Sequence, residues 1–181
     1  MALHVILFIL VLKFSGFMLR KQKVLETLTS LGIPYELHEH PPVPTIEEAK
    51  IYWKGIDATH CKNLFFRNHK GNQHYLVIFE HSQVLDIHDL EKRLKQGKIS
   101  FASDKRMMKY LGLTPGSVSI FGLIYDSERH VQVFIDENLK NSNRISFHPN
   151  INTASVIISY KDFEKFLIWR GNKFTYLSLY E

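Results

Sequence analysis

The chain has a single cysteine, Cys61, among its 181 residues. One cysteine excludes an internal disulfide framework and any zinc site built from cysteines alone, and it fits a reducing, cytoplasmic setting. There is no H-E-x-x-H or C-x-x-C pattern, and the ten histidines are not spaced as zinc ligands, so we expect no metal. There is also no G-x-S-x-G elbow, which argues against a serine-hydrolase nucleophile.

The chain also lacks an apolar run long enough to span a bilayer, which takes about 20 residues. The run from Val5 to Leu12 is too short, and it has neither the basic flank nor the small-residue cleavage site of a signal peptide. We favour Met18 as the natural start, which makes residues 1–17 an upstream extension or an artefact. A membrane anchor is the alternative, but we expect no stable membrane association.

Charge of one sign is only slightly in excess. The formal net charge is +5, with 45% hydrophobic and 23% charged residues, which is ordinary for a soluble globular protein. A positive balance favours encounter with a polyanion such as nucleic acid, but it does not specify which one. The length suits one domain with a proper core.

Hydrophobic spacing and turn residues predict the secondary structure. Thr45 and Glu48 form a capping box that opens a short helix, and Gly32, Gly112 and Gly171 end helices. The predicted helices cover residues 24–31, 45–53, 86–94, 103–111 and 163–170. The predicted strands cover residues 33–38, 61–66, 73–79, 120–125, 131–135 and 155–160, with a turn at 114–117.

The predicted strands come mostly in adjacent pairs rather than alternating strictly with helices. This order favours an α+β (mixed α/β) fold, a single domain with a largely antiparallel mixed sheet flanked by helices. We place that domain at residues 18–171, followed by a C-terminal tail at 172–181.

The segment from Cys61 to Gly71 is the most informative one. It is typical of a short apolar strand that ends in a turn, yet Lys62 and Asn63 open it. Lysine is rarely buried, so Lys62 suggests a cation directed at an anionic group, although a solvated strand-end lysine would look the same. Cys61 could be an activated nucleophile, but a small buried apolar residue explains it more simply.

Three further segments carry polar groups on loops. Gly116 and Ser117 lie in a small-residue loop whose bare backbone N–H groups could bind a carboxylate, a phosphate or a developing oxyanion, or could form a simple turn. The segment from His38 to Pro42 is a proline-stiffened turn. The segment from His148 to Thr153 is a polar loop between strands, in which His148 is either catalytic or structural.

Taken in order, these segments resemble the YbaK / aminoacyl-tRNA synthetase-associated editing domain family, and most closely its free-standing prolyl-tRNA editing members. The resemblance runs from about Leu19 to Gly171 and rests on many motifs in register. They are His40-Pro41-Pro42-Val43, Thr45-x-Glu47-Glu48-Ala49, Lys62-Asn63-Leu64-Phe65, Ser100-Phe101-Ala102-Ser103, Leu111-Gly112-x-x-Pro115-Gly116-Ser117-Val118-Ser119, Phe121-Gly122-Leu123, Val133-x-Ile135-Asp136, His148-Pro149 and Asn152-Thr153.

The resemblance implies a mixed α/β domain that hydrolyses the ester joining a wrong amino acid to tRNA, typically alanine on proline tRNA, without a cofactor. The implied partners are mischarged tRNA and prolyl-tRNA synthetase. The implied catalytic residues are Lys62, Asn63, Gly116, Ser117 and His148, and Asn152 is carried over as a substrate-binding residue. The family loop reads G-x-x-x-P, but here its last position is Ile120, which puts loop geometry in doubt.

Position beside these groups suggests the remaining substrate-binding candidates, which are His40, Thr45, Phe65, Ile120 and Phe121. Bulky walls predict a small pocket that suits alanine and serine ahead of proline. Two alternatives stay open: a non-catalytic tRNA- or synthetase-binding module of the same fold, and a hydrolase of small thioesters or amino-acid esters that does not need tRNA.

Overall fold

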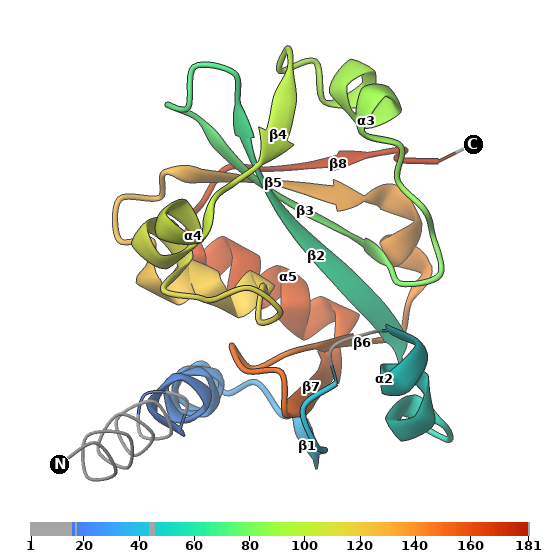
Figure 1. Ribbon diagram of the computed structural model, residues 1–181. Coiled ribbons are helices and arrows are strands. Elements are labelled where there is room, and N and C mark those ends of the chain that lie inside the picture. The colour runs from blue at the N-terminus through green and yellow to red at the C-terminus, as the bar shows by residue number, and fades with distance from the viewer. Residues whose placement is uncertain (1–15, 17, 44–45, 181) are drawn as a thin grey trace, which may run out of the picture.

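The strands of the computed structural model form one mixed sheet, ordered β1-β7-β6-β2-β3-β5-β8, with β4 paired to β2 off this path (Figure 1). The structure describes residues 16, 18–43 and 46–180. The strands are β1 Glu36–Glu39, β2 Thr59–Asn68, β3 His74–Glu80, β4 Ile99–Phe101, β5 Val131–Asp136, β6 Arg144–Phe147, β7 Ala154–Ser159 and β8 Phe174–Leu177. The pairs β1–β7, β2–β3, β2–β4 and β6–β7 are antiparallel, and β2–β6, β3–β5 and β5–β8 are parallel.

Helices cover both faces of this sheet (Figure 1). Residues 18–30 are helical, and the other helices are α2 Ile46–Trp53, α3 Ile87–Leu94, α4 Asp104–Leu111 and α5 Tyr160–Arg170, with 3-10 helices η1 Ile120–Tyr125 and η2 Glu137–Asn141. One buried cluster joins β2, β3 and β5 to α4, η1 and α5, and a second cluster joins their other face to α3. The mixed α/β fold expected from the sequence is therefore confirmed.

Several predicted helix ends match the structure because the capping residues act as expected. The Asp86 carboxylate accepts a hydrogen bond from the Asp89 N–H at the start of α3. Gly112 and Gly171 take left-handed conformations at the ends of α4 and α5. The predicted N-cap Thr45 and the predictions for residues 1–15 and 17 lie outside the described residues.

The strand predicted at residues 120–125 is wrong, because this segment is the 3-10 helix η1. The Ser119 side chain accepts a hydrogen bond from the Phe121 N–H and starts the turn. Gly122 lies so close to Leu111 and Leu113 that a Cβ there would approach their side chains to 3.0 and 2.8 Å. The first four residues of this apolar run are buried, so the periodicity of the run does not distinguish a strand from a tight helix.

Among the described residues, the middle of β2 has no strand partner along one of its edges. β3 pairs with β2 from Cys61 to Arg67 along the other edge. On the open edge, β6 pairs only with Thr59 and His60, and β4 pairs only from Phe66 onward. The Phe65 oxygen accepts a hydrogen bond from the Ala102 N–H at 2.9 Å, so residues 61–64 face the gap in the sheet. Side chains from both faces of the sheet can reach this gap.

The sequence suggested that Lys62 and Asn63 open this strand, but the strand begins three residues earlier, at Thr59. Lys62 is the fourth residue of the ten-residue strand β2, at the open edge.

Among the described residues, no helix has the length and hydropathy needed to cross a membrane.

Candidate active site

A cavity of about 460 Å³ lies along the open edge of β2. Residues from β2, β4, α2 and α4, from the segment before α2, and from the loops after β3, β4, α4 and β6 line it. They are Val43, Ala49, Trp53, Cys61, Lys62, Asn63, Leu64, Phe65, His81, Phe101, Ala102, Asp104, Met107, Pro115, Gly116, Val118 and His148. The gap in the sheet thus brings together residues from distant parts of the sequence.

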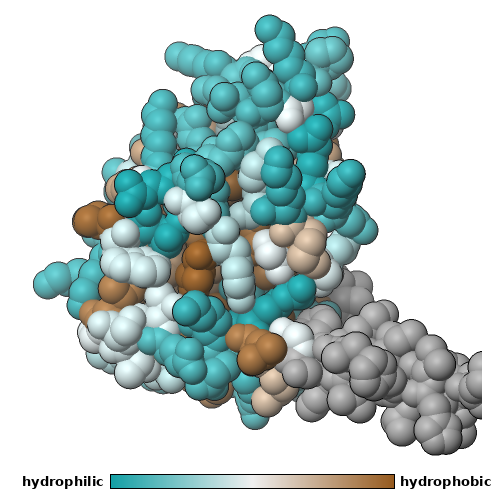
Figure 2. All heavy atoms as spheres, turned by 90° about the vertical axis from the view of Figure 1, so that its left-hand side faces the viewer, coloured by the Kyte–Doolittle hydropathy of each residue, from teal (hydrophilic) through white to brown (hydrophobic). Residues whose placement is uncertain are grey.

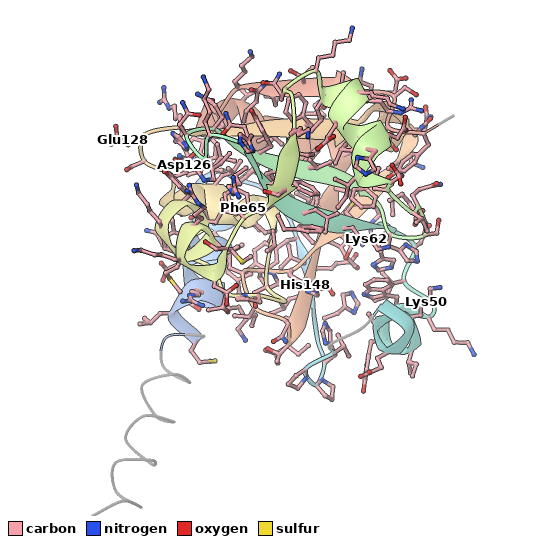
Figure 3. All side chains as sticks on the ribbon, turned by 45° about the horizontal axis from the view of Figure 1, so that its top comes forward. Lys50, Lys62, Phe65, Asp126, Glu128 and His148 are labelled. Atoms are coloured by element: carbon pink, nitrogen blue, oxygen red, sulfur yellow. The ribbon has the colours of Figure 1, made fainter. Side chains whose placement is uncertain are left out.

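Lys62 supplies a cation to this cavity. Its Nζ donates to the Gln83 backbone oxygen at 3.3 Å and lies 5.9 Å from the centre of the Phe79 ring. Among the described residues no carboxylate forms an ion pair with it. Figure 3 shows Lys62 and Phe65 on β2 and His148 below them, while Lys50 on α2 extends outward. The ammonium is therefore free to bind an anionic or carbonyl group of a ligand.

Asn63 is the next cavity residue on β2. Its Oδ1 is buried and has no hydrogen-bond partner among the described residues. A buried acceptor without a donor costs about 1–3 kcal/mol, so such groups usually meet a ligand or a water. The side chain can therefore accept a hydrogen bond from a ligand in the cavity.

Gly116 lines the cavity on a tight turn. The Ser117 N–H donates to the Thr114 oxygen at 3.1 Å, and Gly116 has φ +79°, which together with Pro115 fits a type II turn. This hydrogen bond occupies the Ser117 N–H, and the Ser117 side chain is buried away from the cavity. Of the two predicted amide donors, the Gly116 N–H is the one without a partner among the described residues.

His148 follows β6 and lines the cavity, and one of its two ring nitrogens is already hydrogen-bonded within the protein. Its Nδ1–H donates to the Ala154 oxygen at 3.0 Å, because a carbonyl can only accept. Burial lowers the pKa of His148 below its ordinary value. The ring is therefore neutral at pH 7, and its Nε2 carries a lone pair that can accept a proton or orient a water.

The loop after His148 is tied to the rest of the site by asparagines. The Asn150 Nδ2 donates to the Phe121 oxygen at 3.1 Å, and the residue is fully buried with φ +61°, which asparagine tolerates. Asn152 lies beside the turn, since a Cβ at Gly116 would be 3.9 Å from its Nδ2. Asn152 is thus next to the catalytic candidates, although it does not line the cavity itself.

Two other predicted residues have less direct positions. His40 is buried behind the cavity, where its Nδ1 contacts the Pro41 oxygen at 2.8 Å and its Nε2 contacts Ser155 Oγ at 3.4 Å. Its ring lies 6.2 Å from that of His148, so it supports this loop. Thr45 lies outside the described residues.

Phe65 lines the cavity, but Ile120 and Phe121 do not. Both are fully buried in the cluster beneath α5 and η1, where Phe121 packs edge-on against Phe166 at 5.2 Å. The expectation that they form pocket walls assumed an extended segment here. Because η1 turns them inward, Ile120 is a core residue at the position where the family pattern has proline.

The apolar wall comes instead from residues that the sequence analysis did not assign to the pocket. Met107 of α4, Phe101, Ala102 and Val118 line the cavity together with Phe65. Met107 falls on the buried stripe of α4, so its spacing alone indicated an ordinary core position.

Cys61 lines the cavity, but it is a poor nucleophile. Burial raises the pKa of its thiol well above the ordinary value, so the thiol stays protonated at neutral pH. Among the described residues, no group of three or more His, Cys, Asp or Glu side chains is arranged to hold a metal ion.

Comparisons with known proteins agree with this geometry. Residues 40–166 match the protein family described as "Aminoacyl-tRNA editing domain". The "Prolyl-tRNA editing protein ProX" of Acetoanaerobium sticklandii is 44% identical over 160 residues, covering 88% of this chain and 97% of that protein. "Prolyl-tRNA synthetase associated domain-containing protein 1" of Bos taurus is 30% identical over 146 residues, covering 78% and 85%.

Solved structures show the same fold. A crystal structure described as a candidate trans-editing enzyme for prolyl-tRNA synthetase has a TM-score of 0.65 at 20% identity, covering 87% of this chain and 96% of its own. That of hypothetical protein APE2540 has a TM-score of 0.66 at 17% identity, covering 86% and 98%. With most of its length matched by the family description and by close relatives, the chain belongs to the aminoacyl-tRNA editing domain family.

Proposed function

We propose that this protein is a trans-editing deacylase that removes alanine from mischarged proline tRNA. As a member of the editing-domain family, it is an ester hydrolase of mischarged aminoacyl-tRNA. The observation that carries the proposal is that Lys62, Asn63, Gly116 and His148 line one cavity. The name of its bacterial relative supports proline tRNA, and tRNA is used in the cytoplasm, where we place the reaction.

The reaction needs positioning more than strong chemical activation, because an aminoacyl ester is already reactive. A water oxygen attacks the ester carbonyl carbon, and the bond from that carbon to the ribose oxygen breaks. The amino acid leaves with a free carboxyl group, and the tRNA regains its terminal hydroxyl. The Gly116 N–H and Lys62 can stabilise the oxyanion, and the neutral Nε2 of His148 can orient the water.

Selection by size follows from the apolar part of the cavity. A synthetase pocket rejects a slightly smaller amino acid only weakly, because one methylene contributes about 1–3 kcal/mol. An editing site can select in the opposite sense by admitting only the smaller residue. Phe65, Met107 and Val118 give this cavity a bulky apolar wall, which supports alanine and serine ahead of proline.

A basic groove on α4 supports a polyanionic substrate. Lys105, Arg106 and Lys109 line a shallow hollow of about 270 Å³ with Ser103 and Tyr110, and Asp104 and Met107 of the same helix line the cavity. Figure 2 views the side of the molecule that carries α4, and most of its upper part is hydrophilic. We infer that tRNA phosphates lie along this groove while the aminoacyl end enters the cavity.

Charge reversal in the groove should therefore lower the affinity for tRNA and make this affinity less dependent on salt concentration. Lys105→Glu with Lys109→Glu removes two cations, and each phosphate that the protein no longer neutralises lowers the log–log salt slope by about 0.7–0.9. A titration of tRNA affinity against salt measures this slope. The control, Lys140→Glu with Lys161→Glu, makes the same change of charge on η2 and α5 and should leave the slope unchanged. Equal slopes for the two double variants would contradict the groove.

The proposal is tested with proline tRNA charged in turn with alanine, serine, cysteine and proline at equal concentration. We expect alanine to be released at least as fast as serine, and both well ahead of proline. A preference for cysteine or a larger residue would contradict the small pocket. Protection of the tRNA from nuclease without ester cleavage would favour a binding module.

Binding to prolyl-tRNA synthetase, which we propose as a further partner, is measured separately.

A further inference from the structure

Three aromatic rings form a wall on one side of the cavity. The Trp53 indole stacks on the His60 ring with centroids 4.2 Å apart and planes inclined by 10°. His81 meets the same indole edge-on at 5.0 Å and 77°. Trp53 and His81 line the cavity, and His60 lies buried behind Trp53. We call these three residues the ring wall.

His60 is unusual for a buried polar residue. It is only 7% exposed, and neither ring nitrogen has a hydrogen-bond partner among the described residues. Burial lowers the pKa of His60 to about 4, so the ring is uncharged at neutral pH. A neutral imidazole without hydrogen bonds acts here as a flat surface under the indole. It holds the Trp53 ring in one orientation and leaves the indole at the cavity.

Lys62 lines the same cavity as Trp53 and His81 of the ring wall. Its Nζ donates to the oxygen of Gln83, which is two residues beyond His81 in the turn after β3. An aromatic face next to a cation is the pairing by which proteins hold a nucleotide, with the base stacked and the ribose or phosphate near the charge. The base itself is uncharged, so the Glu80 carboxylate that contacts His81 Nδ1 does not repel it.

The size of the cavity leaves room for more than an amino acid. Its volume of about 460 Å³ lies within the range of about 300–1,000 Å³ that is typical for pockets of drug-sized ligands. An alanyl group contains only a few heavy atoms. The remaining space is large enough to admit the nucleoside to which the amino acid is esterified.

We propose that the ring wall binds the adenine base of the tRNA 3′-terminal nucleoside by stacking on Trp53, an inference that rests on the proposed function. His60 and His81 are positioning residues that fix the indole. With the base on Trp53 and the ribose near Lys62, the ester that this ribose carries is held between Lys62, Gly116 and His148. Recognition of the base, which all tRNAs share, then contributes affinity, and the apolar wall selects the amino acid.

The chain has two tryptophans, which makes the wall observable by fluorescence. Trp169 is exposed on α5 and does not line the cavity, so Trp169→Phe leaves Trp53 as the only indole. The probes are the stable alanyl amide of 3′-amino-3′-deoxyadenosine, and alaninamide, which lacks the nucleoside. We expect saturable quenching of Trp53 by the adenosine amide and none by alaninamide at equal concentration. Absence of quenching by the adenosine amide, or equal quenching by both probes, would overturn the proposal.

Variants at Trp53 complete the test by calorimetric titration with the same adenosine amide. Stacking contributes about 1–3 kcal/mol per base, so Trp53→Ala should weaken binding about 5- to 150-fold. Trp53→Phe keeps an aromatic face and should recover most of this loss, which controls for damage to α2. Equal affinity of the wild type and Trp53→Ala would refute the wall. Binding of the amide without any alanyl-tRNA hydrolysis would instead refute the proposed function and leave the wall intact.

Discussion

Lys62→Ala is expected to lower the rate of alanyl-tRNA deacylation about 10²- to 10³-fold, the usual effect of removing one donor from a developing oxyanion. Lys62 is half-buried at the open edge of β2 and has no carboxylate partner among the described residues, so its charge is available to the substrate. Single-turnover kinetics with labelled alanyl-tRNA measure the effect.

The fold should tolerate this change. Within the described part of the chain, the side chain bonds one backbone oxygen and lies over one ring, so the free energy of unfolding should fall by about 1 kcal/mol or less. Lys50→Ala is the matched control, because Lys50 is an exposed cation on α2 that extends away from the cavity (Figure 3). If Lys62→Ala deacylates at a rate near that of the wild type, the site has been assigned wrongly.

His148→Ala is expected to lower the rate about 10²- to 10⁴-fold, the range attributed to a positioned general base. The wild-type rate should be constant above the lowered pKa of His148 and should fall at lower pH, because protonation removes the Nε2 lone pair. A pH–rate profile under single-turnover conditions measures this fall.

The free energy of unfolding should also fall as the pH is lowered, as the deacylation rate does. The pKa of His148 is lower in the folded chain than its unfolded value of about 6.5, so between these two values the unfolded state binds more protons. The stabilising contribution of the neutral ring is complete above about pH 6.5. It is lost as the pH falls toward the folded pKa, and thermal unfolding at several pH values measures this loss.

His148→Asn separates catalysis from structure. The asparagine amide can replace Nδ1–H as a donor to the Ala154 oxygen, but it has no lone pair equivalent to Nε2. We expect this variant to fold as the wild type does and to be as slow as His148→Ala. Recovery of wild-type turnover in His148→Asn would show that the histidine only holds the loop.

The elements that the sequence predicted well carry local signals. The helices α3, α4 and α5 have a capping side chain or a terminal glycine and a clear apolar stripe. The strands β4, β6 and β8 were not predicted, because segments of three or four residues show too little of a period unless a turn residue such as Pro34 marks them, as it does before β1. Strand β8 forms only by pairing with β5, a contact between distant parts of the sequence.

In the site too, residues with a local sequence signal were predicted, and residues that meet only through long-range packing were not. Lys62, Asn63, Gly116 and His148 were found because each lies in a recognisable segment. Trp53 and His81 were missed because nothing in their own segments indicates a ligand. They meet only when α2 packs beside the turn after β3, and a single sequence does not encode that contact in any local pattern.

Release of amino acid from two forms of one tRNA shows whether the protein edits alanyl-tRNA. Proline tRNA charged with labelled alanine or with labelled proline is incubated with the purified protein at equal concentration, and free amino acid is counted over time. We predict rapid release of alanine and a prolyl ester that stays intact. No release of alanine, or equal release of both amino acids, would show that the protein is not an alanine-specific deacylase.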